Sequence, residues 1–93
     1  MRDSVADIAR IFARSGDARL IEAFLRQLLT RDELQGIDSR WKLVQMLHEG
    51  RTQREISRRL GLSLCKITRG SRELKKKDGA FLKVLRAEEK LHG

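Results

Sequence analysis

The alternation of helix-start and helix-stop signals constrains this chain more than any other feature. Residues that can cap the N-terminus of a helix alternate with glycines, which can end one. The start signals are Asp17, the pairs Thr30–Glu33 and Thr52–Glu55, and Ser63, and the stop signals are Gly16, Gly50 and Gly61. Because the chain has no proline and many good helix formers, this pattern predicts an all-α fold of about six helices.

Apolar residues recur at helical spacing between these signals. Segment 4–15 carries one apolar stripe and predicts a first helix that ends at Gly16. The second helix, after Asp17, has an apolar surface too wide for a helix with one wet side, so it needs cover on two sides. The third, which runs to about Glu49, is the longest and is expected at the centre of the fold.

The positive charge is concentrated in one segment. Residues 51–77 contain ten basic residues and two acidic ones, which equals the net charge of +8 of the whole chain, and the rest of the chain is neutral. A concentrated positive field attracts polyanions, and phosphate backbones are the commonest target. The alternative interpretation is a solvated basic surface without a partner.

The same segment has the pattern of a helix-turn-helix. A short helix after Thr52 is broken by Gly61, and Ser63 can cap a second helix that starts at Leu64. Four apolar residues are expected to hold the two helices together, and small Ser57 permits their close approach. These four are Ile56, Leu60, Leu62 and Ile67.

In such a motif the second helix enters the DNA major groove, and its N-terminal side chains meet base edges. Neighbouring residues on both helices are better placed for phosphates. The residues predicted to bind DNA are Gln53, Arg54, Ser57, Leu64, Cys65, Lys66, Thr68, Ser71, Arg72 and Lys75.

A chain of 93 residues is long enough for one domain, and a domain of this size buries too little surface to be comfortably stable alone. We therefore expect a homodimer. The alternative is that the wide apolar surface of the third helix is only the inside of a monomeric bundle. Within a single domain, 1–93, we assign 1–50 to a dimerisation core and 51–77 to the DNA-binding region. A C-terminal helix within 78–93 is expected to complete the core.

Other function classes find little support. No nucleophile has a neighbouring base and no glycine-rich loop could cradle phosphate, so the sequence does not predict an enzyme. The lone Cys65 has no partner for a disulfide or a common zinc site, so no metal is expected. His48 is interpreted as a C-terminal helix cap. An RNA-binding or protein-interaction module is disfavoured because no exposed aromatic residues remain for stacking. The charged start and the absence of a long apolar run predict a soluble, cytoplasmic protein.

Four stretches, "LLTRDEL", "SRWKLVQMLHEG", "TQREISRRLG" and "ITRGSREL", occur in this order within residues 20–85. They resemble the trp operon repressor family, the tryptophan-dependent regulators of tryptophan biosynthesis. The resemblance implies an intertwined homodimer whose two helix-turn-helix units bind double-stranded operator DNA one helical turn apart. It also implies repression of tryptophan biosynthesis or uptake genes with L-tryptophan as corepressor and no other cofactor. The connection from Gly50 to Gln53 is one residue shorter than the family pattern.

The resemblance further implies where L-tryptophan binds. The indole would lie between Arg40 and Arg69, because a guanidinium can stack on an indole face and also pair with a carboxylate. Gly70 would allow close approach of the ligand, and Leu29 and Thr30 of the other subunit would supply further contacts.

Two positions in this site depart from the family pattern by adding charge. Lys66 and Glu73 stand where small polar residues are common in the family. They could hold the carboxylate and the ammonium of the amino acid, or they could pair with each other. The alternative function is a related DNA-binding protein that needs no tryptophan or responds to another ligand.

Overall fold

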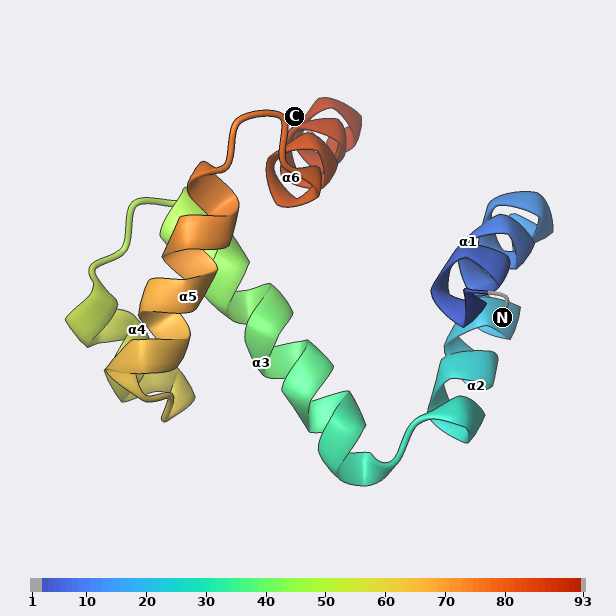
Figure 1. Cartoon of the computed structure of the whole chain (residues 1–93), viewed down its shortest axis with the longest axis horizontal. Coiled ribbons are helices and arrows are strands. Elements are labelled where there is room, and N and C mark those ends of the chain that lie inside the picture. Colours follow the sequence, from blue (N-terminus) through green and yellow to red (C-terminus); the bar gives the residue numbers. More distant parts are fainter. Residues whose placement is uncertain (1–2, 93) are drawn as a thin grey trace. The chain divides into compact units, whose positions relative to one another are not determined.

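The computed structural model describes residues 3–92 and folds into six helices joined by short turns (Figure 1). The described residues contain no strand, so the predicted all-α class is confirmed. The helices are α1 (Ser4–Ser15), α2 (Ala18–Leu28), α3 (Arg31–His48), α4 (Gln53–Leu60), α5 (Leu64–Lys75) and α6 (Ala80–His92). They belong to two compact units, residues 1–34 and 35–93. The predicted division into a dimerisation core (1–50) and a DNA-binding region (51–77) concerns a dimer and stays a prediction.

Polar side chains begin these helices where the sequence predicts them. The Asp17 carboxylate accepts hydrogen bonds from two backbone N–H groups at the start of α2, and the Ser63 hydroxyl accepts one at the start of α5. Asp3, which was not among the predicted start signals, caps α1 in the same way. Each cap satisfies N–H groups that have no partner inside the helix, so the starts are fixed by local chemistry.

The two predicted capping boxes differ. In the first, Thr30 N–H donates to the Glu33 carboxylate (2.8 Å) and Glu33 N–H donates to the Thr30 hydroxyl (3.2 Å), which is the full reciprocal arrangement. In the second, Glu55 N–H donates to the Thr52 hydroxyl (3.1 Å), but the Glu55 carboxylate binds Arg51 instead of returning to Thr52. The second box is therefore only half formed, which corrects the prediction.

The unit of residues 1–34 contains α1 and α2 and buries no residue of either helix. Phe12 and Phe24 meet edge to face with ring centroids 5.8 Å apart. Much of the apolar surface remains exposed in the single chain, which agrees with the expectation that α2 needs cover on two sides. The large exposed apolar side chains here are Val5, Ile11, Leu20, Phe24 and Leu28.

The unit of residues 35–93 has a core. Leu43 of α3, Ile56 of α4 and Ile67 of α5 are buried together. Further apolar residues pack around these three, namely Met46, Leu47, Leu60 and Leu62. All four residues predicted to hold the helix-turn-helix together thus lie in this cluster, and α5 is fixed against both α4 and α3 (Figure 1).

A polar contact joins α3 to α6. Nε2 of His48 lies 2.5 Å from Oε1 of Glu89, and Leu85 of α6 is buried. The end of α3 is instead closed by backbone bonds from the N–H groups of Gly50 and Arg51. His48 is therefore an inter-helix contact and not the predicted C-terminal cap.

Candidate nucleic-acid interface and ligand cavity

The turn between α4 and α5 is fixed by one backbone conformation and two hydrogen bonds. Gly61 ends α4 with φ +65°, a backbone conformation that residues with a Cβ rarely adopt. The Ser57 hydroxyl donates to the Leu62 carbonyl (2.8 Å), and Ser63 then caps α5. Ser57 was predicted to bind DNA and to permit close helix approach; in this structure it is half-buried and its hydroxyl belongs to the turn.

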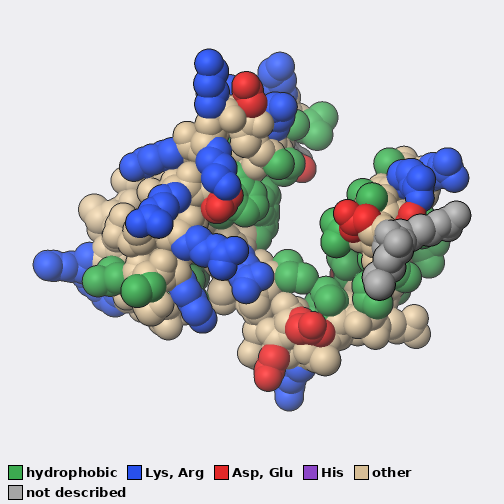
Figure 2. Space-filling model, viewed as in Figure 1, with side chains coloured by type: hydrophobic (Ala, Val, Ile, Leu, Met, Phe, Trp, Pro, Cys, Tyr) green, Lys and Arg blue, Asp and Glu red, His purple; other side chains and the backbone are tan. Residues whose placement is uncertain are grey.

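The two sides of α5 face different surroundings. Ile67 and Gly70 are buried, whereas most of the predicted DNA-binding side chains of α5 are exposed. Exposed are Leu64, Cys65, Lys66, Arg72 and Lys75 of α5 and Gln53 and Arg54 of α4, and Thr68 and Ser71 are half-buried. Figure 2 shows Lys and Arg side chains gathered on the face formed by this part of the chain. The helix therefore has a basic exposed side on which DNA could bind.

A cavity of about 580 Å³ lies along the other flank of α5. Its walls come from α3, α5 and α6 and from the turn that precedes α5. The lining residues are Gln35, Gly36, Ser39, Arg40, Leu43, Val44, Leu62, Lys66, Arg69, Gly70, Glu73 and Phe81. Five of the predicted ligand residues, Arg40, Lys66, Arg69, Gly70 and Glu73, are thus brought around one space, which is large enough for a drug-sized ligand.

The comparisons with known proteins agree on one family. The sequence profile described as "Trp repressor protein" matches residues 3–89. The chain belongs to this family. The family consists of DNA-binding regulators and not enzymes, and the predicted resemblance and function class are confirmed.

Individual relatives carry the same description. A "Trp operon repressor homolog" of Vibrio parahaemolyticus is 38% identical over 74 residues, covering 78% of this chain and 72% of the relative. One of Chlamydia trachomatis is 40% identical over 72 residues, covering 72% of this chain and 77% of the relative. No solved structure matches the chain significantly.

Two charged residues of the cavity, Lys66 and Glu73, were considered as a pair from the sequence. The Glu73 carboxylate is 2.9 Å from Lys76 Nζ, so it pairs with a residue one turn away and not with Lys66, the partner considered from the sequence. Such a pair partly neutralises the only acid that lines the cavity. Arg40, Lys66 and Arg69 remain as cations around the same space, and the cavity is electrostatically suited to an anionic group.

Gly70 has a packing reason that sequence reasoning missed. A Cβ at this position would lie 2.8 Å from Cδ2 and 3.3 Å from Cγ of Leu43, which is itself buried. The glycine therefore permits the close contact of α5 with α3 whether or not a ligand is bound. Gly70 also lines the cavity, so the predicted contact with a ligand stays a prediction.

Four further residues bear on the ligand site, two that were predicted and do not line the cavity and two that line it and were not predicted. Leu29 and Thr30 do not line the cavity, and their predicted role in the partner subunit stays a prediction. Gly36 was not predicted, although its place one turn before Arg40 on the same face of α3 was a usable signal. Phe81 comes from α6, and no local pattern places it here.

Two further features are absent from the described residues. No group of three or more His, Cys, Asp and Glu side chains could hold a metal ion there. Within the same residues, no helix is both long and apolar enough to cross a membrane.

Proposed function

We propose that this chain is a sequence-specific, cytoplasmic repressor of tryptophan biosynthesis or uptake genes, with L-tryptophan as corepressor. It binds double-stranded operator DNA as a homodimer. One observation carries the proposal: α5 presents Arg72 and Lys75 to solvent on one side and Arg69 to the ligand cavity on another. A ligand in the cavity would therefore touch the same helix that meets DNA.

The chemistry of the cavity suits an aromatic amino acid. Leu43, Val44 and Phe81 supply apolar walls. Arg40 and Arg69 supply guanidinium groups, which stack on aromatic faces and bind carboxylates. A ligand that bridges α3 and α5 would restrict the angle between them, and this angle sets how α5 enters a DNA groove.

The homodimer is supported by the apolar surface that a single chain leaves exposed. Leu20 and Leu28 of α2 are 60% and 52% exposed, and Val84 of α6 is 48% exposed. Monomeric proteins rarely leave such a surface uncovered. A second copy would also place two reading helices at a fixed spacing, as a palindromic operator requires.

The direct test is calorimetric titration of the protein with L-tryptophan, followed by DNA binding with and without it. The probe is promoter DNA from tryptophan biosynthesis or uptake genes. Because linkage is reciprocal, the factor by which tryptophan raises DNA affinity must equal the factor by which DNA raises tryptophan affinity. Equal DNA affinity in both conditions would contradict the corepressor role and leave DNA binding intact.

Variants separate the two surfaces of α5. Arg69→Ala should weaken L-tryptophan binding about tenfold through loss of the stacking and charge contacts. Lys42→Ala is the matched control, because Lys42 pairs with Asp38 (2.9 Å) on α3 and does not line the cavity.

Lys75→Ala should weaken binding to all DNA sequences about equally. It should also reduce the salt slope, which is the slope of log affinity against log salt concentration, by about one unit. A change of sequence preference with Lys75→Ala would contradict the placement of the reading helix.

A second candidate ligand follows from the charges of the cavity. Since Glu73 is paired with Lys76, three cations face the ligand, and an aromatic carboxylate without an amino group would fit this balance better than a zwitterion. Titration with indole-3-propionate beside L-tryptophan distinguishes the two. Tighter binding of tryptophan would exclude this alternative.

A further inference from the structure

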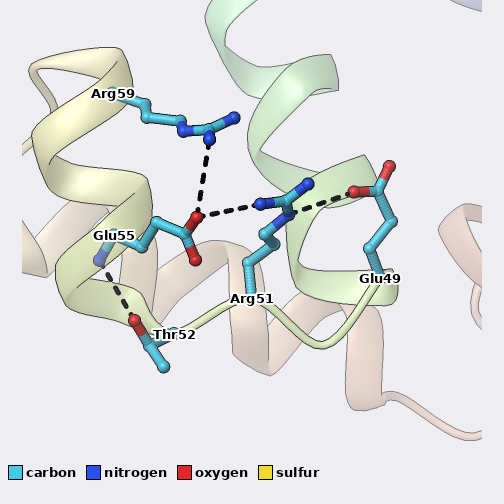
Figure 3. Close-up of polar contacts among 5 residues, drawn as sticks. All are labelled: Glu49, Arg51, Thr52, Glu55 and Arg59. Carbon is cyan, nitrogen blue, oxygen red and sulfur yellow. Dashed lines mark hydrogen bonds and ion pairs between the residues drawn. The ribbon is translucent and has the colours of Figure 1, made fainter.

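Arg51 connects the end of the central helix to the start of the DNA-binding motif (Figure 3). Only four residues, Glu49, Gly50, Arg51 and Thr52, separate the end of α3 at His48 from the start of α4 at Gln53. The backbone N–H of Gly50 donates to the Leu47 carbonyl (3.0 Å), and that of Arg51 donates to the Met46 carbonyl (3.1 Å). This is the Schellman arrangement, so the backbone of Arg51 is fixed to α3.

The side chain of Arg51 binds the other helix. One guanidinium NH2 group, Nη1, donates to Oε1 of Glu55 on α4 (2.8 Å), while Nε donates to Oε2 of Glu49 (3.4 Å). The same Glu55 oxygen is 3.7 Å from Arg59, and the backbone N–H of Glu55 is bonded to Thr52. These five residues form one polar cluster, which we call the Arg51 cluster, and Figure 3 shows them converging on Glu55 and Arg51. The cluster thus ties the end of α3 to the first two turns of α4.

The first turn of α4 depends on these polar contacts. The buried contact of α4 with the core begins at Ile56, and Gln53 and Arg54 before it are exposed. Gly50 has φ +86°, so the connection passes through a conformation that only a few residue types adopt. The core holds the middle of α4, and the Arg51 cluster holds its beginning.

Glu55 is an unexpected residue for a surface that binds phosphate. It is one of two acids among residues 51–77, and by its charge alone it weakens attraction to DNA. Its carboxylate is occupied by Arg51 and approached by Arg59, and hydrogen bonding to Glu55 raises the pKa of Arg51. The contribution of Glu55 to a DNA-binding protein therefore lies in its contacts within the protein and not in attraction to phosphate.

We propose that Arg51 and Glu55 are positioning residues that set the direction in which α4, and α5 with it, leaves α3, and that they thereby favour specific over non-specific DNA. The proposal rests on the DNA-binding function above. Base edges are read only when the reading helix lies at the correct angle in the groove, whereas phosphate contacts tolerate a change of angle. Loss of the Arg51 cluster therefore weakens specific binding more than non-specific binding.

The sign of the Glu55→Gln effect tests this proposal. The probes are a duplex selected from random DNA by the unaltered protein and a scrambled duplex of the same composition, measured with saturating L-tryptophan over a range of salt. We expect Glu55→Gln to bind the selected duplex about three- to tenfold more weakly, in line with the modest energy of exposed ion pairs. The scrambled duplex should be bound equally or more tightly, because an acid has been removed.

Arg51 variants supply the second measurement. Arg51→Lys keeps the charge but cannot reach both carboxylates with a planar fork, so it should lower the ratio of specific to non-specific affinity without changing the salt slope. The double variant Arg51→Gln with Glu55→Gln should lower this ratio no further than either single change. Circular dichroism and unfolding curves confirm that each variant is folded.

Two controls match these changes in charge. Asp38→Asn removes an acid that is paired on α3 and should leave the ratio unchanged. Arg58→Gln removes an exposed cation of α4 outside the Arg51 cluster and should weaken both duplexes about equally.

Three outcomes would overturn the proposal. Tighter binding of both duplexes by Glu55→Gln would mean that Glu55 affects DNA binding only through its negative charge. A salt slope smaller by about one unit in Arg51→Gln, with equal loss on both duplexes, would make Arg51 a phosphate contact. If the unaltered protein selected no duplex at all, the proposed function would fail and the positioning role with it.

Discussion

Residues 1–34 and 35–93 are both helical and rich in apolar side chains, but they use these side chains differently. In 35–93, Leu43, Ile56 and Ile67 fill a core within the single chain. In 1–34, no residue of α1 or α2 is fully buried, and Leu20 is 60% exposed. The helix-turn-helix unit therefore carries its own packing energy, whereas α1 and α2 need another surface to cover theirs. An uncovered apolar surface on 1–34 is what a homodimer with its interface in this region would require.

The largest expected effect comes from removing the buried side chain of Ile67. Ile67→Ala should lower the free energy of unfolding by about 2–5 kcal/mol, because it leaves a cavity in the only core of 35–93 among the described residues. Ile11→Ala makes the same chemical change on α1, where the side chain is 57% exposed, and should cost a single chain about 0.5 kcal/mol or less. Urea unfolding of both variants at a protein concentration low enough to keep the chains monomeric measures both. Similar losses would remove the contrast between the two regions.

A charge on α2 tests whether its exposed face is an interface. Leu20→Glu should raise the dissociation constant of the homodimer about 10- to 100-fold, because a buried unpaired charge opposes association. Leu64→Glu is matched in exposure, 59% against 60%, but lies on the reading helix and should leave the dimer intact. Sedimentation velocity over a range of concentrations distinguishes them. A dimer that survives Leu20→Glu would place the interface elsewhere.

Two glycines in 35–93 are expected to respond in opposite directions. At Gly70 a new Cβ would overlap buried Leu43, at a cost of about 1–3 kcal/mol, against a gain of about 1 kcal/mol in helix propensity. At Gly36 a Cβ would meet nothing within 4 Å, so only the gain applies. Thermal unfolding should therefore show Gly70→Ala destabilised and Gly36→Ala stabilised. Stabilisation by both would mean that α5 is not tightly packed on α3.

The smallest effect is the pH dependence of the capping box in 1–34. The hydrogen bond from Thr30 N–H, and then that from the Thr30 side chain, lowers the pKa of Glu33 below its ordinary 4.5. A lowered folded-state pKa means that the stabilisation is present above the unfolded-state value and is lost as the pH falls through the folded-state value. Unfolding curves from pH 6 to pH 3 should show that Glu33→Gln loses less stability on acidification than the unaltered protein.

A control for this titration lies on the neighbouring helix. Glu22→Gln removes an acid that pairs with Arg26 within α2 and caps no helix. It should follow the unaltered protein in the acid range more closely than Glu33→Gln does. The reverse order would show that the Thr30–Glu33 box does not contribute to acid stability.

Much of the fold could be predicted because its signals are local. Asp17, Ser63 and the Thr30–Glu33 pair act within one helical turn, so reading them in sequence is enough to place helix starts. The apolar residues of the helix-turn-helix, Ile56 and Ile67 among them, are close in sequence and meet as their periodicity predicts. The cavity residues on α3 and α5 were found through the family resemblance and not through spacing.

The errors arose where a side chain had more than one partner within reach. Glu55 was expected to return to Thr52, but Arg51 offers its carboxylate a donor that itself carries a positive charge. His48 was expected to cap its own helix, but it meets Glu89, which is 41 residues further along the chain. No local pattern ranks such competitors.

The sequence alone determined where the helices begin and end, which segment is basic, and to which family the chain belongs. Local hydrogen bonds, apolar periodicity and charge are properties of neighbouring residues, so they can be read without the fold. Only the tertiary structure decided that Gly70 packs on Leu43, that Phe81 lines the cavity, and that Arg51 joins α3 to α4. These contacts depend on the angles at which helices pack or leave their turns, which no single segment specifies.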